Sequence, residues 1–485
     1  MVRVPMSKKK RELPPLSPTL PFALSPDPEP ALLTALGGLP LVAQTFRTLK
    51  LHESVERHVV VKERQRGFSE SEVVESLVLL HAAGGDCVDD LRRLKADEGL
   101  EPMLGHAIPT PEMVRPFLER FHSDALIEAA KAARKPAQVA FIPAETAPLE
   151  GLARVNDDLL RETGRRMPTE RIATVDQDAT IQESRKKEAL PHYEGGCGYQ
   201  PMVAVWAETL LVLADEFRDG NVPAGMEPLT VCQRAFRALP ATVGRYFYRA
   251  DSASYEWRLM DWLRDEQRRD GPHGPIGFAI SADMSKEIRA AIVALPETAW
   301  TPYQAPGEDV DAERDWAEVP FVPSEPSEKK DRTPLRYVGI RIRPRQGALF
   351  ADGNEVKHFA VVTNRSDLDG AKLLQWHREK AGTIEQVHDI VKNDLGGGVL
   401  PSKYFGANAA WMRIALLAHN VLVALKRIAL PPELLRARPK RLRFEIFVQA
   451  GRLVSHARTF TLRLRLGVER LASLLSAWRA LLAPA

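Results

Sequence analysis

The 485-residue sequence predicts an α/β protein whose core is a mixed sheet flanked by helices. Two patterns predict this class. Between residues 172 and 217, three segments alternate apolar and polar residues with the period of two that is typical of strands. Between residues 231 and 281, helical segments alternate with strand-like ones. At about 100 to 200 residues per domain, a chain of this length is expected to form two to four domains.

Composition favours a protein that works in the cytoplasm. The 44% hydrophobic and 27% charged residues are ordinary for a globular protein. We find no apolar run of about 18 residues that would span a membrane. Cys87, Cys197 and Cys232 are far apart and lack CxxC spacing, which argues against a disulfide framework and against a zinc site.

The N-terminal part is predicted to be an arm followed by a helical domain. Residues 1–30 hold eight prolines and a basic run at residues 8–11, which predicts a flexible arm that either touches DNA phosphates or only aids solubility. Residues 31–135 contain a capping box at Ser69 to Glu72 and a helix start at Thr110-Pro111. Short helices in a row are typical of DNA-binding or dimerisation modules, and equally of any small helical bundle.

Residues 136–285 are predicted to form the first part of the core. The strand over residues 172–181 places Asp176 and Asp178 on one face, because side chains two apart share a face. A hairpin, a helix and a strand ending at Asp251 follow, and then a further helix and strand. This order is that of an RNase H-like core, in which the first and fourth strands are neighbours. Asp178 and Asp251 are therefore expected to be close in space.

The remaining residues complete the predicted domains. Residues 286–370 read as a β-rich insertion, and residues 371–430 return to the core. There, Glu385 and Lys392 are seven residues apart, which is two helical turns, so the two side chains share one face. His419 and Asn420, on an apolar helix, are expected to be buried and hydrogen-bonded.

The C-terminal region, residues 431–485, is basic. Between residues 436 and 466 it carries nine Lys or Arg against one acid. Arg463 and Arg465 alternate with leucines, as in a strand with one basic face. Such a stripe indicates a polyanion as partner, although a merely solvated charge run has the same composition.

Four segments, taken together and in order, resemble the DDE transposases of bacterial insertion sequences. The likeness covers most of residues 170–430. It implies a cut-and-paste enzyme of the group with an RNase H-like core and a β-rich insertion domain, which uses two Mg2+ ions, with Mn2+ as a substitute. The segments that carry it are Asp176-Gln-Asp-Ala-Thr180, Glu216 to Gly225, Arg249-Ala-Asp251-Ser, and Gly382-Thr-Ile-Glu385 through Lys392.

The resemblance also assigns roles. It implies a catalytic triad of Asp178, Asp251 and Glu385, with Lys392 gripping a phosphate beside the metals. Paired hard cations about 3.5 to 4 Å apart need several carboxylate oxygens, so Asp176 is expected to join the metal ligands. The implied partners are double-stranded DNA, as terminal inverted repeats and target, and a second subunit on that DNA. No membrane partner is expected, and the enzyme would associate with the nucleoid.

Further residues are expected to contact DNA. Either Arg378 or Lys380 would take the place of the family's usual arginine, whose spacing differs here. Trp300 or Trp316 would stack on an unpaired base, and the other candidates would meet phosphates. Two alternatives stay open: a metal-dependent nuclease that cuts without joining, and a decayed transposase that only binds DNA. The phosphate-contacting candidates are Arg341, Arg343, Arg463 and Arg465.

Overall fold

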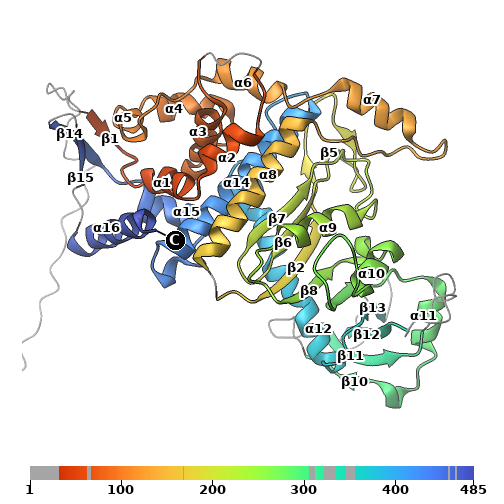
Figure 1. The fold of residues 1–485 in the computed structure, drawn as a ribbon. Coiled ribbons are helices and arrows are strands. Elements are labelled where there is room, and N and C mark those ends of the chain that lie inside the picture. Colours follow the sequence, from red (N-terminus) through yellow and green to blue (C-terminus); the bar gives the residue numbers. More distant parts are fainter. Residues whose placement is uncertain are drawn as a thin grey trace, which may run out of the picture.

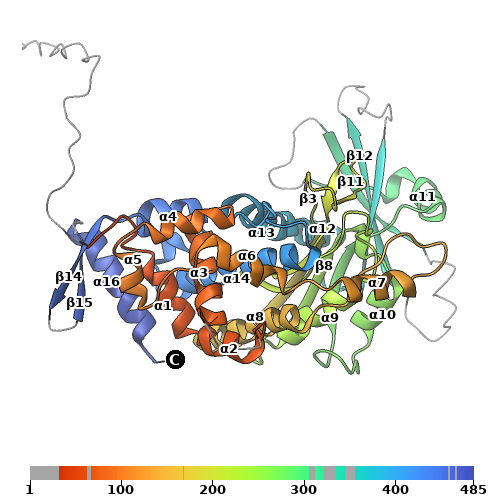
Figure 2. The same ribbon diagram turned by 90° about the horizontal axis from the view of Figure 1, so that it is seen from above.

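The protein is described from a computed structural model that covers residues 32–62, 67–167, 169–304, 312–321, 334–344, 356–456, 459–464 and 467–484. The predicted arm over residues 1–30 and the predicted DNA contact Arg465 lie outside these ranges. In both Figure 1 and Figure 2, the C-terminal elements α16 and β14–β15 lie at one end and strands β11 and β12 lie at the other. Between them, a helical half joins a sheet.

The central sheet has nine strands in the order β10-β11-β12-β13-β9-β8-β2-β6-β7. Strand β2 is antiparallel to β6 and parallel to β8, and β8 is parallel to β9. The first and fourth strands of the core are therefore neighbours, which confirms the RNase H-like order. The core strands are β2 (Ile172–Ala179), β6 (Met202–Trp206), β7 (Leu211–Glu216), β8 (Arg245–Ala250) and β9 (Ile276–Ser281). The crossover helices are α9 (Pro228–Ala238) and α10 (Trp257–Arg264).

The strands predicted for the β-rich insertion extend this sheet. Strand β13 pairs antiparallel with β9, with Val361 opposite Ser281 and Thr363 opposite Ala279. The strands of the insertion therefore continue the core sheet from the carboxyl end of strand β9. The local sequence pattern does not reveal this pairing. Its elements are α11 (Lys286–Val293), β10 (Thr301–Pro302), β11 (Ala312–Val319), β12 (Arg336–Pro344) and β13 (Lys357–Thr363). A separate small sheet contains β3 (Gln182–Glu183), β4 (Leu190–Pro191) and β5 (Cys197–Tyr199).

The N-terminal region that was predicted to be helical, residues 31–135, is helical from α1 to α7. The Ser69 side chain accepts a hydrogen bond from the Glu72 amide while the Glu72 carboxylate accepts one from the Ser69 amide, which is the predicted capping box. Gly84 ends that helix in the left-handed conformation, with φ of 95°. The helices are α1 (Pro40–Thr48), α2 (Leu51–His58), α3 (Glu70–Ala83), α4 (Leu91–Lys95), α5 (Leu100–Leu104), α6 (Pro111–Glu119), α7 (Asp124–Ala133) and α8 (Ala147–Arg166).

Helix α14 (Phe405–Ile428) runs through the centre of the helical half. It is long and apolar enough to cross a membrane, so the expectation that no such run exists is wrong. Its apolar window is fully buried inside the protein, because helices α1, α3, α6 and α8 pack around it. His419 contacts the Leu210 carbonyl at 2.8 Å, and Asn420 pairs with the backbone of Val212. Both side chains are thus buried and hydrogen-bonded, as predicted.

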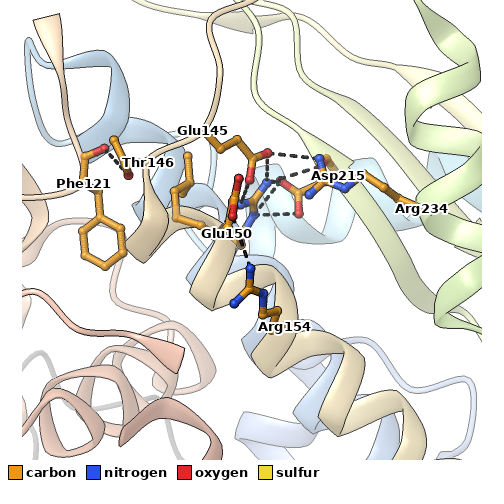
Figure 3. Close-up of polar contacts among 9 residues, drawn as sticks. Phe121, Glu145, Thr146, Glu150, Arg154, Asp215 and Arg234 are labelled. Atoms are coloured by element: carbon orange, nitrogen blue, oxygen red, sulfur yellow. Dashed lines mark hydrogen bonds and ion pairs between the residues drawn. The ribbon is translucent and has the colours of Figure 1, made fainter. Parts of the chain in front are cut away.

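A buried ion cluster joins the helical half to the sheet. Arg413 of α14 contacts Asp215 of β7 at 2.9 Å and Glu145, which precedes α8, at 2.8 Å. Arg234 of α9 contacts the same Glu145 at 3.1 Å, as Figure 3 shows. Burial alone would raise the pKa of Glu145, but Arg413 and Arg234 lower that pKa to about 2. Four elements are therefore fixed to one another by compensating charges.

The C-terminal region contains the expected strand with Arg463 and a final helix, and the strand is paired in a hairpin. It contains α15 (Pro439–Leu442), the hairpin β14 (Gly451–His456) and β15 (Thr459–Leu464), and α16 (Val468–Leu482). The hairpin forms a second three-stranded sheet with β1 (Leu32–Thr34), which the sequence pattern did not predict.

Candidate active site

Two of the predicted acids lie at one edge of the core sheet, where the neighbouring strands β2 and β8 have their carboxyl ends. Asp178 is the second-last residue of strand β2, and Asp251 directly follows strand β8. In the parallel register of these strands Gln177 is opposite Ala250, so the two acids are the next residues along. Burial, together with the charges of Asp251 and Glu385 and against the opposing charge of Lys380, raises the pKa of Asp178 to about 6. Asp178 and Asp251 are therefore neighbours, and Glu385 lies near enough for its charge to act on Asp178.

Glu385 is carried by a helix that packs against strands β2 and β6. Helix α12 (Gly370–Arg378) ends in a tight turn over Glu379–Gly382, and α13 (Ile384–Asp389) then carries Glu385 in its first turn. The predicted regular helix to Lys392 is wrong, because a π-helical turn begins at Ile390. π-turns inside helices occur frequently at functional sites. Lys392 still reaches the sheet, where its ammonium donates to the Ile181 carbonyl at 3.0 Å.

Asp176 has a different environment from Asp178. Its side chain is fully buried, and Arg249 donates to both carboxylate oxygens at 2.7 and 2.9 Å. The hydroxyl of Thr383 donates to the same carboxylate. Both oxygens are thus engaged with the protein itself, so we omit Asp176 from the metal ligands and assign it a positioning role.

Arg249 is a site residue that the sequence reasoning missed. Besides Asp176, it contacts Glu379 at 3.2 Å and donates to the Trp376 carbonyl at 2.5 Å. Its guanidinium also lies over the Trp376 ring, 5.3 Å from the centroid. One arginine therefore attaches α12 and the following turn to the sheet. The signal that the sequence offers is a charged residue, Arg249, within an apolar strand and two residues before Asp251.

Of the two candidates for the family's arginine, Lys380 is the one in contact with the acids. Its ammonium lies 2.5 Å from an Asp251 carboxylate oxygen. Arg378 instead lines a cavity of about 510 Å³ beside Asp251, together with His377, Tyr303 and Phe359. Burial lowers the pKa of His377 to about 4, so that imidazole is neutral at neutral pH.

The predicted DNA contacts on the insertion strands are largely occupied within the protein. Arg341 contacts Glu297 at 2.7 Å and Asp315 at 3.0 Å, and its guanidinium lies 4.4 Å from the Trp300 ring centroid. Arg341 and Trp300 are thus packed on each other, and Trp300 is not among the residues that line the cavity beside Asp251. Arg343 also contacts Asp315, at 2.9 Å, but its side chain is 39% exposed.

The basic C-terminal run is only partly available to a partner. Arg438 and Lys440 contact Asp394 at 2.9 and 3.1 Å, and Arg443 donates to the carbonyl oxygens of α3. Arg463 is exposed on β15, directly opposite the exposed Arg452 on β14. Like charges facing each other across a hairpin destabilise it, which is consistent with a site for an anionic partner.

The residues at the sheet edge fit hard divalent cations. Mg2+ prefers carboxylate oxygens, and the raised pKa of Asp178 has burial as its first cause and the nearby negative charge of Asp251 as its second. In the described part of the chain, the acids and thiol whose ligand atoms all lie within 4.8 Å of one another are those of Asp86, Cys87 and Asp90, and the three acids at the sheet edge do not form so tight a group. There, Asp90 accepts from the Asp86 amide and the Cys87 thiol, as a residue in a helix-start turn does.

Comparisons with known proteins give the family of the chain. A family model described as transposase DDE domain group 1 matches residues 31–476. No curated protein matches the chain. Among solved structures, the cryo-EM structure of the piggyBac transposase synaptic complex with hairpin DNA is similar over 84% of this chain and 85% of that chain. Its identity of 9% and TM-score of 0.33 are too low to carry an argument. Because the family model covers nearly the whole chain, the protein belongs to the DDE transposases of this group.

Proposed function

We propose that this transposase cuts the strand ends of its own element in a metal-dependent reaction and joins them to target DNA. The observation that carries the proposal is the convergence of Asp178, Asp251 and Glu385 at one sheet edge. The three acids come from two parallel strands and one helix, an arrangement that suits a phosphodiester approaching the edge from solvent.

The three carboxylates are the proposed ligands of two Mg2+ ions, with Mn2+ as a substitute. Bound there, the ions would supply Lewis-acid activation of the attacking oxygen and charge stabilisation at the leaving oxygen. Asp178 carries a proton below pH 6, so it must release that proton to act as a ligand in slightly acidic solution. Asp251 has 46% of its side chain exposed, and Glu385 is exposed on α13, so both are accessible from solvent.

The surrounding residues would position the acids and the DNA. Arg249, Asp176 and Thr383 fix the segment that leads into α13, and so fix Glu385 against the sheet. Lys392 would bind a phosphate next to the scissile bond, because its half-buried ammonium has, among the described residues, the Ile181 carbonyl as its one hydrogen-bond partner. Arg378 would face DNA that enters the cavity beside Asp251.

The proposed reaction has two displacements at phosphorus. In the first, a water oxygen forms a bond to phosphorus while the bond to the 3′ oxygen breaks, leaving a 3′ hydroxyl. In the second, that hydroxyl oxygen attacks a target phosphodiester and displaces another 3′ oxygen. The substrates would be the element's terminal inverted repeats and target duplex, bound by a homodimer in the nucleoid. Arg343 and Arg463 are the exposed candidates for phosphate contact.

The experiment is a cutting and joining assay with Mg2+ on duplexes that end in the sequences flanking this gene. Asp251→Asn and Glu385→Gln are expected to abolish both products. Asp283→Asn, at an exposed acid that lines the same cavity, is the matched control and should retain them. Unchanged cutting by the two triad variants would refute the proposal. Cutting without joining would favour the nuclease, and binding without cutting would favour the decayed, DNA-binding protein.

A further inference from the structure

Lys380 occupies an unusual position among the proposed metal ligands. Its ammonium lies 2.5 Å from an Asp251 carboxylate oxygen, and only 10% of its side chain is exposed. The same ammonium acts on Asp178, where its charge opposes the effect of burial on the pKa of that acid. A single positive charge therefore lies close to two of the three acids, in the region where a shared cation is needed.

The backbone around Lys380 is held firmly. The Lys380 carbonyl accepts from the Thr383 hydroxyl at 2.9 Å and from the Thr383 amide at 3.1 Å. Glu379, the preceding residue, contacts Arg249, which in turn holds Asp176. The turn that carries Lys380 thus cannot move away from the sheet without breaking these contacts. Its four-carbon side chain remains the part that can reorient.

We propose that Lys380 is a resident counter-ion that competes with divalent metal for Asp251. This inference rests on the proposed function of the acids as metal ligands. With its ammonium in place, the three carboxylates and one lysine present less negative charge to an incoming ion than the carboxylates alone. Metal binding requires the ammonium to leave Asp251, so part of the binding free energy is spent on breaking this ion pair.

The proposal also changes the predicted role of Lys380 toward DNA. Its ammonium contacts a phosphate only after it leaves Asp251, so that contact belongs to the metal-loaded state. His377, the neighbouring titratable side chain, cannot replace the lysine as a counter-ion, because its imidazole is buried and neutral.

The test is calorimetric titration of Mn2+ into the full chain without DNA, at pH 8. Lys380→Met, which keeps the length of the side chain without its charge, should bind Mn2+ about 10-fold more tightly than the wild type, within the usual range of coupling between two ligands. Lys380→Arg should stay close to the wild type. Lys372→Met, at an exposed lysine of α12 that contacts Asp369, is the matched control and should not change the affinity.

Two further measurements separate the possible failures. The thermal shift produced by a fixed Mn2+ concentration should be larger for Lys380→Met, and Lys380→Gln gives a second uncharged variant if the first is poorly folded. Equal or weaker Mn2+ binding by both uncharged variants would overturn the inference. Asp178→Asn and Glu385→Gln should abolish Mn2+ binding in the wild-type background. If they do not, the proposed metal site itself fails, whatever Lys380 does.

Discussion

Arg249 and Asp176 lie opposite each other on the parallel strands β8 and β2, and the guanidinium donates to both carboxylate oxygens at 2.7 and 2.9 Å. Both side chains are almost fully buried. The pair stands next to the proposed catalytic acids but does not belong to them. Its physical effect is to fix the segment before α13, through Thr383 and Glu379, so that Glu385 faces the ends of the two strands.

Loss of this pair is expected to destabilise the fold strongly. Arg249→Met leaves the Asp176 carboxylate buried without a cation and should lower the free energy of unfolding by about 3–5 kcal/mol. Urea denaturation measures this change. The double variant Asp176→Asn with Arg249→Met removes both charges and should recover part of the loss. A single variant as stable as the wild type would contradict the positioning role.

Asp178 is expected to make stability depend on pH. The folded state raises the pKa of this carboxyl from 3.8 to about 6, so between these values the folded protein binds more protons than the unfolded one. Stability therefore falls as pH rises through this window. Asp178→Asn removes the effect and should stabilise the metal-free protein at pH 7.5 by up to about 3 kcal/mol, with no gain near pH 3.5. A gain that is equal at both pH values would show that the cause is not this titration.

Substitution of the exposed Arg463 and of the buried Arg341 should have opposite effects on DNA binding and on stability. Arg463→Ala removes an exposed charge, so DNA binding should weaken a few-fold and its salt dependence should lose about one counter-ion, with little effect on melting. Arg341→Ala instead leaves the buried Asp315 with the more exposed Arg343 as its partner and should lower stability by about 1–3 kcal/mol. Binding isotherms at several salt concentrations and thermal melts measure both effects. Equal behaviour of the two variants would contradict the assignment.

The order of the core strands could be predicted from the sequence because it depends on local patterns. Alternation in β2 and β9 defined the strands, the capping box at Ser69 defined a helix start, and the order of the elements predicted that Asp178 and Asp251 would be neighbours. The signals for single strands and helices lie within a few residues of the features that they predict, and the adjacency of the two acids follows from the order of those elements.

Contacts between distant side chains could not be predicted in this way. Nothing near Arg341 in the sequence shows that Glu297 accepts its charge, and the pairing of β13 with β9 joins segments about 80 residues apart. The π-helical turn that contains Lys392 has no local signal in the sequence either, because the spacing of apolar residues there also suits a regular helix. For this reason, the prediction that Arg341 and Trp300 contact DNA does not foresee that the two side chains pack on each other.

The most direct test of the proposed metal centre is to locate a bound ion by iron-mediated backbone cleavage. Fe2+ with ascorbate, in place of Mg2+, produces radicals that cut the chain beside the ligands, and mass spectrometry maps the cuts. We predict cuts next to Asp178, Asp251 and Glu385 that excess Mg2+ suppresses. Cuts confined to another place, such as the Asp86 to Asp90 turn, would contradict the account.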